Sequence, residues 1–111
     1  MYNSLKNKTL GGGGKVLPRD TINRRVKSYV EKKLNTDFDH IEPDDRMDII
    51  YVLVNNYEYS VPELIQLFGR CRATIYREIS NANFIQKSIA KRKKHSEKIL
   101  DYILYNAKYI P

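Results

Sequence analysis

The sequence predicts an all-α fold, because apolar residues recur at steps of three and four along several stretches of its 111 residues. Residues typical of helix ends border these stretches, with Pro43 and Ser60 at two starts and Gly69 at one end. The predicted architecture is a trihelical helix-turn-helix domain over 18–82 with a C-terminal helical extension over 83–111.

The first seventeen residues show no such apolar pattern. Lysines flank the Gly11–Gly14 run, so we expect a flexible basic arm over 1–17. The glycines and Lys15 do not make a phosphate loop, because Thr9 stands at the position of its first glycine and Val16 at that of its Ser or Thr.

Two amphipathic helices are predicted next. The first begins at Asp20 or Thr21, runs for about 14 residues, and has an apolar face formed by Ile22, Val26, Tyr29, Val30 and Leu34. The second begins at Pro43 in an acidic first turn, which suits the positive end of the helix dipole, and ends near Asn56. Because apolar residues cover most of its circumference, we expect the second helix to be largely buried.

Residues 60–81 predict two short helices that meet at Gly69. Ser60 and Glu63 form a capping box, which fixes the start of the first helix. Gly69 can take a positive φ angle and so ends it. The second helix, of about ten residues, is expected to end at Asn81–Asn83. Its polar and aromatic side carries Arg72, Ala73, Tyr76, Arg77 and Ser80.

The stretch from Gly69 to Ile79 resembles the helix-turn-helix of insertion-element transposases. Their pattern Gly-Arg-Ser-x-Ser-Thr-Ile-x-Arg-Glu-Ile is matched here by Gly-Arg-Cys-Arg-Ala-Thr-Ile-Tyr-Arg-Glu-Ile. The run is also similar to the DNA-binding end of resolvase-type recombinases. The resemblance implies that Thr74 meets a phosphate and that base edges are faced by Arg72, Ala73, Tyr76 and Arg77. Cys71 replaces a capping Ser, and because a thiol is a weak acceptor we expect a poorer cap.

The composition favours a polyanionic partner and no catalysis. Lys and Arg number 20 against 13 Asp and Glu, which gives a formal charge of +7 and favours nucleic acid. A chain of this length is too short to add a catalytic domain to a DNA-binding one, so we expect no enzyme activity and no cofactor. His40 and His95 have no second ligand at helical spacing, so no metal is expected. One cysteine and no membrane-length apolar run or signal peptide predict a cytoplasmic protein.

Residues 84–110 predict one long helix or two, with Asn83 and Gln86 as a possible cap. The first half is strongly basic and almost without apolar residues, so we expect it to stay in solvent. The second half has an apolar stripe formed by Ile99, Leu100, Ile103, Leu104, Ala107 and Ile110. This stripe either folds back onto the monomer core or packs against a second chain. We favour the homodimer, because the basic segment would hold the stripe away from the core.

The sequence therefore predicts a sequence-specific double-stranded DNA-binding protein, a small transcriptional regulator of phage or mobile-element origin. The base contacts are expected from Arg72, Ala73, Tyr76, Arg77 and Ser80. The phosphate contacts are expected from Ser60, Arg70, Thr74, Lys87, Lys91, Arg92, Lys93 and Lys94. A homodimer would bind an inverted-repeat site. The alternatives are a structural DNA adaptor, such as a phage packaging or plasmid-maintenance subunit, and a degenerate recombinase fragment.

Overall fold

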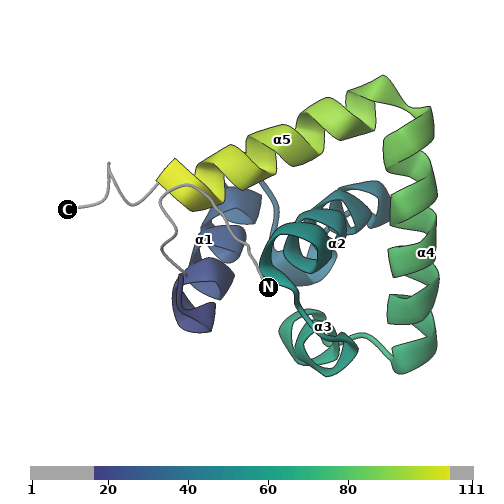
Figure 1. Cartoon of the computed structure of the whole chain (residues 1–111). Helices are drawn as coiled ribbons and strands as arrows, with labels where there is room; N and C mark the ends of the chain where they lie inside the picture. The colour runs from purple at the N-terminus through teal and green to yellow at the C-terminus, as the bar shows by residue number, and fades with distance from the viewer. Residues whose placement is uncertain (1–16, 106–111) are drawn as a thin grey trace, which may run out of the picture.

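The computed structural model describes residues 17–105, and within this range every regular element is helical (Figure 1). The elements are α1 (Arg19–Lys32), the short 3-10 helix η2 (Phe38–His40), α2 (Pro43–Tyr57), α3 (Val61–Phe68), α4 (Arg72–Ser88) and α5 (Ala90–Tyr105). The all-α prediction is confirmed. The predicted basic arm, up to residue 16, and the stripe positions Ala107 and Ile110 lie outside the described residues.

Helix α2 forms the centre of the fold, with the other α-helices arranged around it (Figure 1). Pro43 occupies its first turn, and Glu58 ends it in the left-handed conformation. Its buried apolar side chains are Met47, Ile49, Ile50, Val52 and Leu53. The prediction of a largely buried second helix is therefore confirmed. None of the helices in residues 17–105 is long and apolar enough to cross a membrane.

Helices α1 and α3 follow the predicted patterns closely. Helix α1 begins at Arg19, slightly before the predicted start, and buries Ile22, Val26, Tyr29 and Val30. At the start of α3 the Glu63 backbone amide donates to Ser60 Oγ over 3.3 Å, and the Ser60 amide donates to Glu63 Oε1 over 2.8 Å. Gly69 ends α3 with φ 68°. Both the capping box and the glycine stop are therefore confirmed.

The Glu63 side chain also ties α3 to α1. Arg19 Nε donates to Glu63 Oε2 over 2.7 Å. This hydrogen bond, followed by the one from the Ser60 amide, lowers the pKa of Glu63 below its usual value. The carboxylate is therefore ionised at neutral pH and suits its place in the first turn of α3.

Helix α4 is longer than predicted. It spans 17 residues and continues through Asn81–Asn83, where a break was expected. Ala82 and Gln86 are buried on its inner side, whereas Asn81 and Asn83 face solvent. An exposed asparagine costs a helix well under about 1 kcal/mol, so burial of the inner side outweighs it. Asn83 thus caps no helix, and the chain turns instead at Ile89.

Helix α5 folds back across α1 and α2, which corrects the predicted role of its apolar stripe (Figure 1). Ile99 and Ile103 are fully buried in the monomer core, and Leu100 packs against it. Ile99 and Ile103 are therefore unavailable to a second chain, so the prediction that these two residues form a dimer interface is wrong. Leu104 is 42% exposed. The predicted boundary at 82–83 falls inside α4, and α5 belongs to the same core as α1–α4.

Candidate nucleic-acid interface

Helices α3 and α4 are joined by three residues, and α4 presents one free side (Figure 1). Its inner side buries Ile75, Glu78 and Ala82. The five residues expected to contact bases are all exposed on the other side; they are Arg72, Ala73, Tyr76, Arg77 and Ser80. The structure therefore brings this predicted set together on one helix face.

A buried ion pair holds α4 against α2. Arg46 Nε donates to Glu78 Oε1 over 2.8 Å, and Nη2 donates to Glu78 Oε2. Both side chains are more than nine-tenths buried. The hydrogen bond from Arg46 to Glu78 raises the pKa of Arg46 above its usual value. Helical spacing did not predict this pair, although Glu78 follows Ile75 by three residues on the apolar face. The sequence signal for a buried ion pair is a charged residue, Glu78, within an apolar stripe.

Cys71 is the N-cap of α4, as the resemblance implied, and its side chain makes no cap hydrogen bond. Its Sγ lies 3.2 Å from Thr74 Oγ1. This contact is the largest cause of a lowered pKa for the exposed Cys71 thiol. The backbone amides of the first turn of α4 therefore lack a strong side-chain acceptor at the cap.

The variant Cys71→Ser is expected to raise the free energy of unfolding by about 0.5–1 kcal/mol, because a serine oxygen accepts from the first-turn amides better than a thiol does. Denaturant unfolding of both proteins measures the difference. Cys71→Ala serves as the control, since it provides no acceptor and should gain nothing. A midpoint of Cys71→Ser at or below that of Cys71→Ala would contradict the expectation.

A second cluster joins the far end of α4 to α2 and α5. Asp48 is 1% exposed and accepts hydrogen bonds from Gln86 Nε2 over 2.9 Å and from His95 Nδ1 over 2.6 Å. Arg92 Nη1 lies 3.1 Å from Asp48 Oδ2, and Ser96 Oγ donates to Gln86 Oε1 over 2.7 Å. We call Asp48, Gln86, Arg92, His95 and Ser96 the Asp48 cluster. It explains how a polar segment, expected to stay in solvent, docks on the core.

Tyr29 lies beside this cluster, with its ring centroid 5.9 Å from that of His95. Burial raises the pKa of Tyr29 to about 12, and the negative charges of Asp45 and Asp48 raise it too. The phenol is therefore neutral at physiological pH. Sequence periodicity gave no sign of the cluster, because Asp48 lies in a largely apolar stretch and its partners lie 38 to 47 residues away.

Three members of this region could in principle hold a metal ion. Ligand atoms of Asp45, Asp48 and His95 lie within 4.8 Å of one another. However, Arg92 Nη1 lies 3.1 Å from Asp48 Oδ2 and 3.6 Å from Asp45 Oδ1. A guanidinium group at this position offsets one of the two negative charges and would repel a cation. The arrangement therefore favours an internal ion-pair network.

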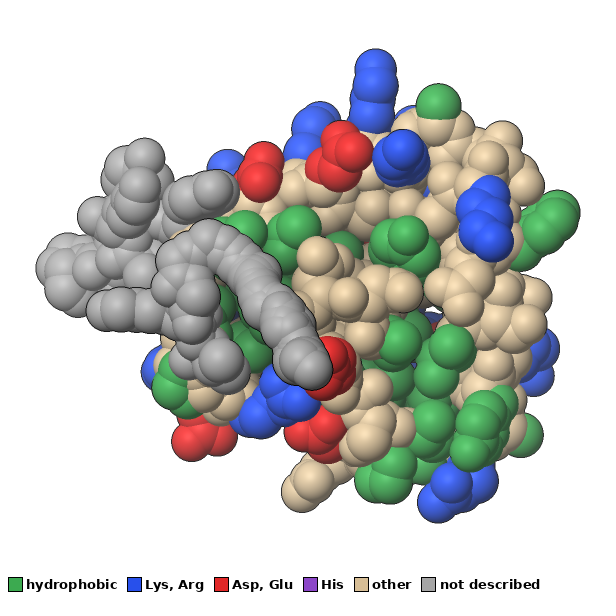
Figure 2. All heavy atoms as spheres, viewed as in Figure 1, with side chains coloured by type: hydrophobic (Ala, Val, Ile, Leu, Met, Phe, Trp, Pro, Cys, Tyr) green, Lys and Arg blue, Asp and Glu red, His purple; other side chains and the backbone are tan. Residues whose placement is uncertain are grey.

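The predicted phosphate-contacting residues divide into three groups. Most are exposed and free of ion pairs within the described residues; these are Arg70, Lys87, Lys91, Lys93 and Lys94. Lys and Arg side chains also gather along the edge of the molecule formed by α5 (Figure 2). Arg92 is different, because its guanidinium is held by Asp45 and Asp48. The prediction that Arg92 meets phosphate is therefore not supported by its placement. Ser60 and Thr74 stand at the starts of α3 and α4.

One further exposed residue on α4 was not singled out from the sequence. Phe84 is 71% exposed, more than Tyr76 at 54%. It lies seven residues after Arg77, so the two share one line along the helix. The free side of α4 is therefore cationic and polar near its start and has an exposed phenyl ring further along.

No family model matches this chain, and neither a curated protein nor a solved structure matches it.

Proposed function

We propose that this chain is a sequence-specific double-stranded DNA-binding protein without catalytic activity, a small transcriptional regulator that places α4 in the major groove. The observation that carries this proposal is the free side of α4. An α-helix fits the major groove, where base edges present a distinct donor and acceptor pattern. A helix held from behind by Ile75 and the Arg46–Glu78 pair can offer that side rigidly.

The proposed roles follow from the chemistry of each side chain. Arg72 and Arg77 carry guanidinium groups suited to bidentate contact with guanine. Tyr76 would contact a base or sugar, and Ser80 and Ala73 would line the same face. Ser60, Arg70 and Thr74, near the helix starts, would meet phosphates. The formal charge of +7 supports association with DNA in general.

The variant Arg77→Ala is expected to weaken binding to the preferred site by about 1–3 kcal/mol and to relax preference at one base pair. Arg24→Ala is the control, because Arg24 is an exposed residue of α1, on the other side of α2 from α4 (Figure 1). It should leave base preference unchanged. A preferred site is first selected from random duplex DNA, and competition binding then compares the variants. Unchanged affinity together with unchanged base preference in Arg77→Ala would contradict the placement of α4 as the recognition helix.

Phe84 favours a second function, the structural DNA adaptor, in which protein assembly is the output. An exposed phenyl ring on the free side of α4 is suited to protein contact as well as to DNA. A homodimer, the other predicted partner, would also need a surface other than buried Ile99 and Ile103. Sedimentation of the protein with and without duplex distinguishes these cases: a closed ring or filament favours the adaptor, and a dimer on an inverted repeat favours the regulator.

A further inference from the structure

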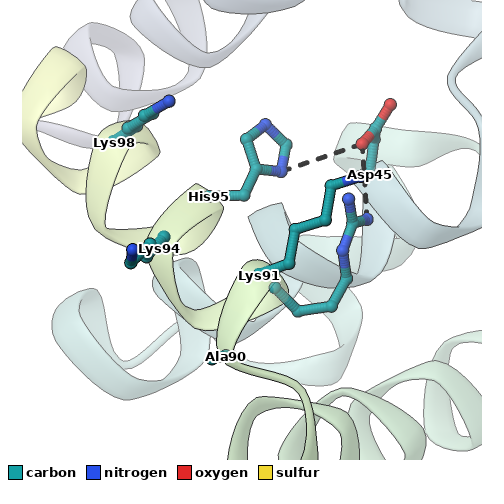
Figure 3. Close-up of a pocket in the computed structure, with 7 residues that line it drawn as sticks. Asp45, Ala90, Lys91, Lys94, His95 and Lys98 are labelled. Carbon is teal, nitrogen blue, oxygen red and sulfur yellow. Dashed lines mark ion pairs between the residues drawn. The ribbon is translucent and has the colours of Figure 1, made fainter.

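We propose that a hollow between the first turns of α5 and the start of α2 seats a phosphate group of the bound DNA backbone. The hollow has a volume of about 450 Å³ and is lined by Asp45, Ala90, Lys91, Arg92, Lys94, His95 and Lys98. Figure 3 shows these side chains around it. The inference rests on the proposed function. It names the phosphate backbone as the part of the DNA that the hollow binds.

Helical geometry places three lysines on this hollow. Lys91, Lys94 and Lys98 follow each other at steps of three and four, so they share one side of α5 and span about 10 Å of its length. Lys93 is also exposed but does not line the hollow, so the proposal departs from the sequence prediction by removing Lys93 from the phosphate contacts. At about 100° per residue, Lys93 points about 160° from Lys91, about 140° from Lys98 and about 100° from Lys94. The neighbouring residues Lys93 and Lys94 therefore differ in the direction of their side chains, and only Lys94 lines the hollow.

The wall of the hollow is fixed by buried contacts. Arg92 and His95 hold the first turns of α5 against Asp48 and Asp45 on α2. Ser96 holds the next turn through Gln86 of α4. Lys91, Lys94 and Lys98 therefore extend from a helix backbone whose position is fixed before any ligand binds. Such preorganisation reduces the ordering cost of binding an anion.

The charges around the hollow favour an anion. Three lysines line it, namely Lys91, Lys94 and Lys98, beside Arg92, whose guanidinium is held by Asp45 and Asp48. One carboxylate lines the hollow, that of Asp45, and its Oδ1 lies 3.6 Å from Arg92 Nη1. The three lysines are not engaged in any ion pair among residues 17–105. Lysine binds phosphate as a compact point charge, so phosphate is the ligand class that fits.

The length of α4 favours the DNA backbone as the source of that phosphate. Its 17 residues are about 25 Å long, whereas the major groove is about 12 Å wide. A helix that enters the groove with its first turns therefore carries its last turns past the rim, where phosphates lie. The hollow is next to this end of α4 in the chain, because its lining residue Ala90 follows Ser88, the last residue of α4, by two positions. A free oligophosphate has the same chemistry and is separated from DNA by experiment.

The first arm of the test measures duplex binding at several salt concentrations, with Lys91→Ala, Lys94→Ala and Lys98→Ala against the matched control Lys93→Ala. Loss of one phosphate contact lowers the slope of log K against log salt by about 0.9. We expect this change in the hollow variants, with base preference unaltered, and little change in Lys93→Ala. Circular dichroism checks that all four proteins keep the wild-type fold. The second arm measures the thermal midpoint of DNA-free protein with inorganic pyrophosphate.

Each outcome decides the proposal. Slope changes confined to the hollow variants, without pyrophosphate stabilisation, support a backbone phosphate. Stabilisation of wild type but not of Lys94→Ala, with equal slopes, shows a free oligophosphate in the hollow and overturns the DNA source. Equal effects of Lys93→Ala and Lys94→Ala in both arms overturn the proposal that the hollow binds a phosphate group. If wild type binds no duplex, the proposed function fails, and the pyrophosphate arm alone decides whether the hollow binds phosphate.

Discussion

The variant Ile103→Asp is expected to lose its cooperative fold. Ile103 is 0% exposed and belongs to the core that α5 shares with α1 and α2. The substitution removes an apolar side chain worth about 1.5–3 kcal/mol when buried and introduces a carboxylate without a partner. The total cost is expected to exceed about 4 kcal/mol, which is comparable with the whole stability of many domains. Far-ultraviolet circular dichroism with urea titration measures the loss.

Leu104→Asp provides the matched control for this variant. Leu104 is the next residue of α5 and is 42% exposed, so a carboxylate at this position stays in contact with water. We expect it to stay folded, with a change in the free energy of unfolding of about 0.5 kcal/mol. A folded, cooperative Ile103→Asp protein would show that α5 does not pack on the core. Sedimentation of Leu104→Asp beside wild type also tests whether the exposed end of the stripe contributes to self-association.

Local sequence signals were sufficient for most helix starts and ends in this fold. The Ser60–Glu63 capping box, Pro43 and Gly69 each act through neighbouring backbone groups, so their consequences can be read from a few residues. The end of α4 could not be predicted in this way. Asn81–Asn83 is a local signal for a break, but the burial of Ala82 against the rest of the fold decides the outcome.

The candidate site shows the same division between local and distant causes. The free side of α4 follows from helical spacing, because Ile75 fixes which side faces inward. The docking of α5 on the core does not follow from helical spacing. It depends on Asp48 meeting His95 from 47 residues away, and the sequence alone gives no reason to pair them. A basic segment without an apolar stripe predicts a solvent-exposed helix, and a solvent-exposed helix would leave Ile99 and Ile103 to a dimer interface. The buried partners of Asp48 overturn both expectations.

The variant Glu78→Ala is expected to lower the free energy of unfolding by about 3–5 kcal/mol. Arg46 and Glu78 are both buried and joined by two hydrogen bonds, so removing the carboxylate leaves a buried guanidinium without its partner. Arg46→Met alone should also destabilise, by leaving the Glu78 carboxylate unpaired. Denaturant unfolding at neutral pH compares the single variants with wild type. A loss below about 1 kcal/mol for both would mean that water reaches the pair and that it behaves as a surface ion pair.

The double variant Arg46→Met with Glu78→Leu separates stability from positioning. Replacing a buried ion pair by apolar residues of similar volume is often neutral or stabilising, so we expect a stability within about 1 kcal/mol of wild type or above it. An ion pair joined by two directed hydrogen bonds fixes the rotation of α4 about its axis, whereas methionine and leucine allow several packings. If α4 reads bases, the folded double variant should keep its salt-dependent binding to DNA but discriminate less between sites. Unchanged discrimination would show that Ile75 and Ala82 alone set the orientation of α4.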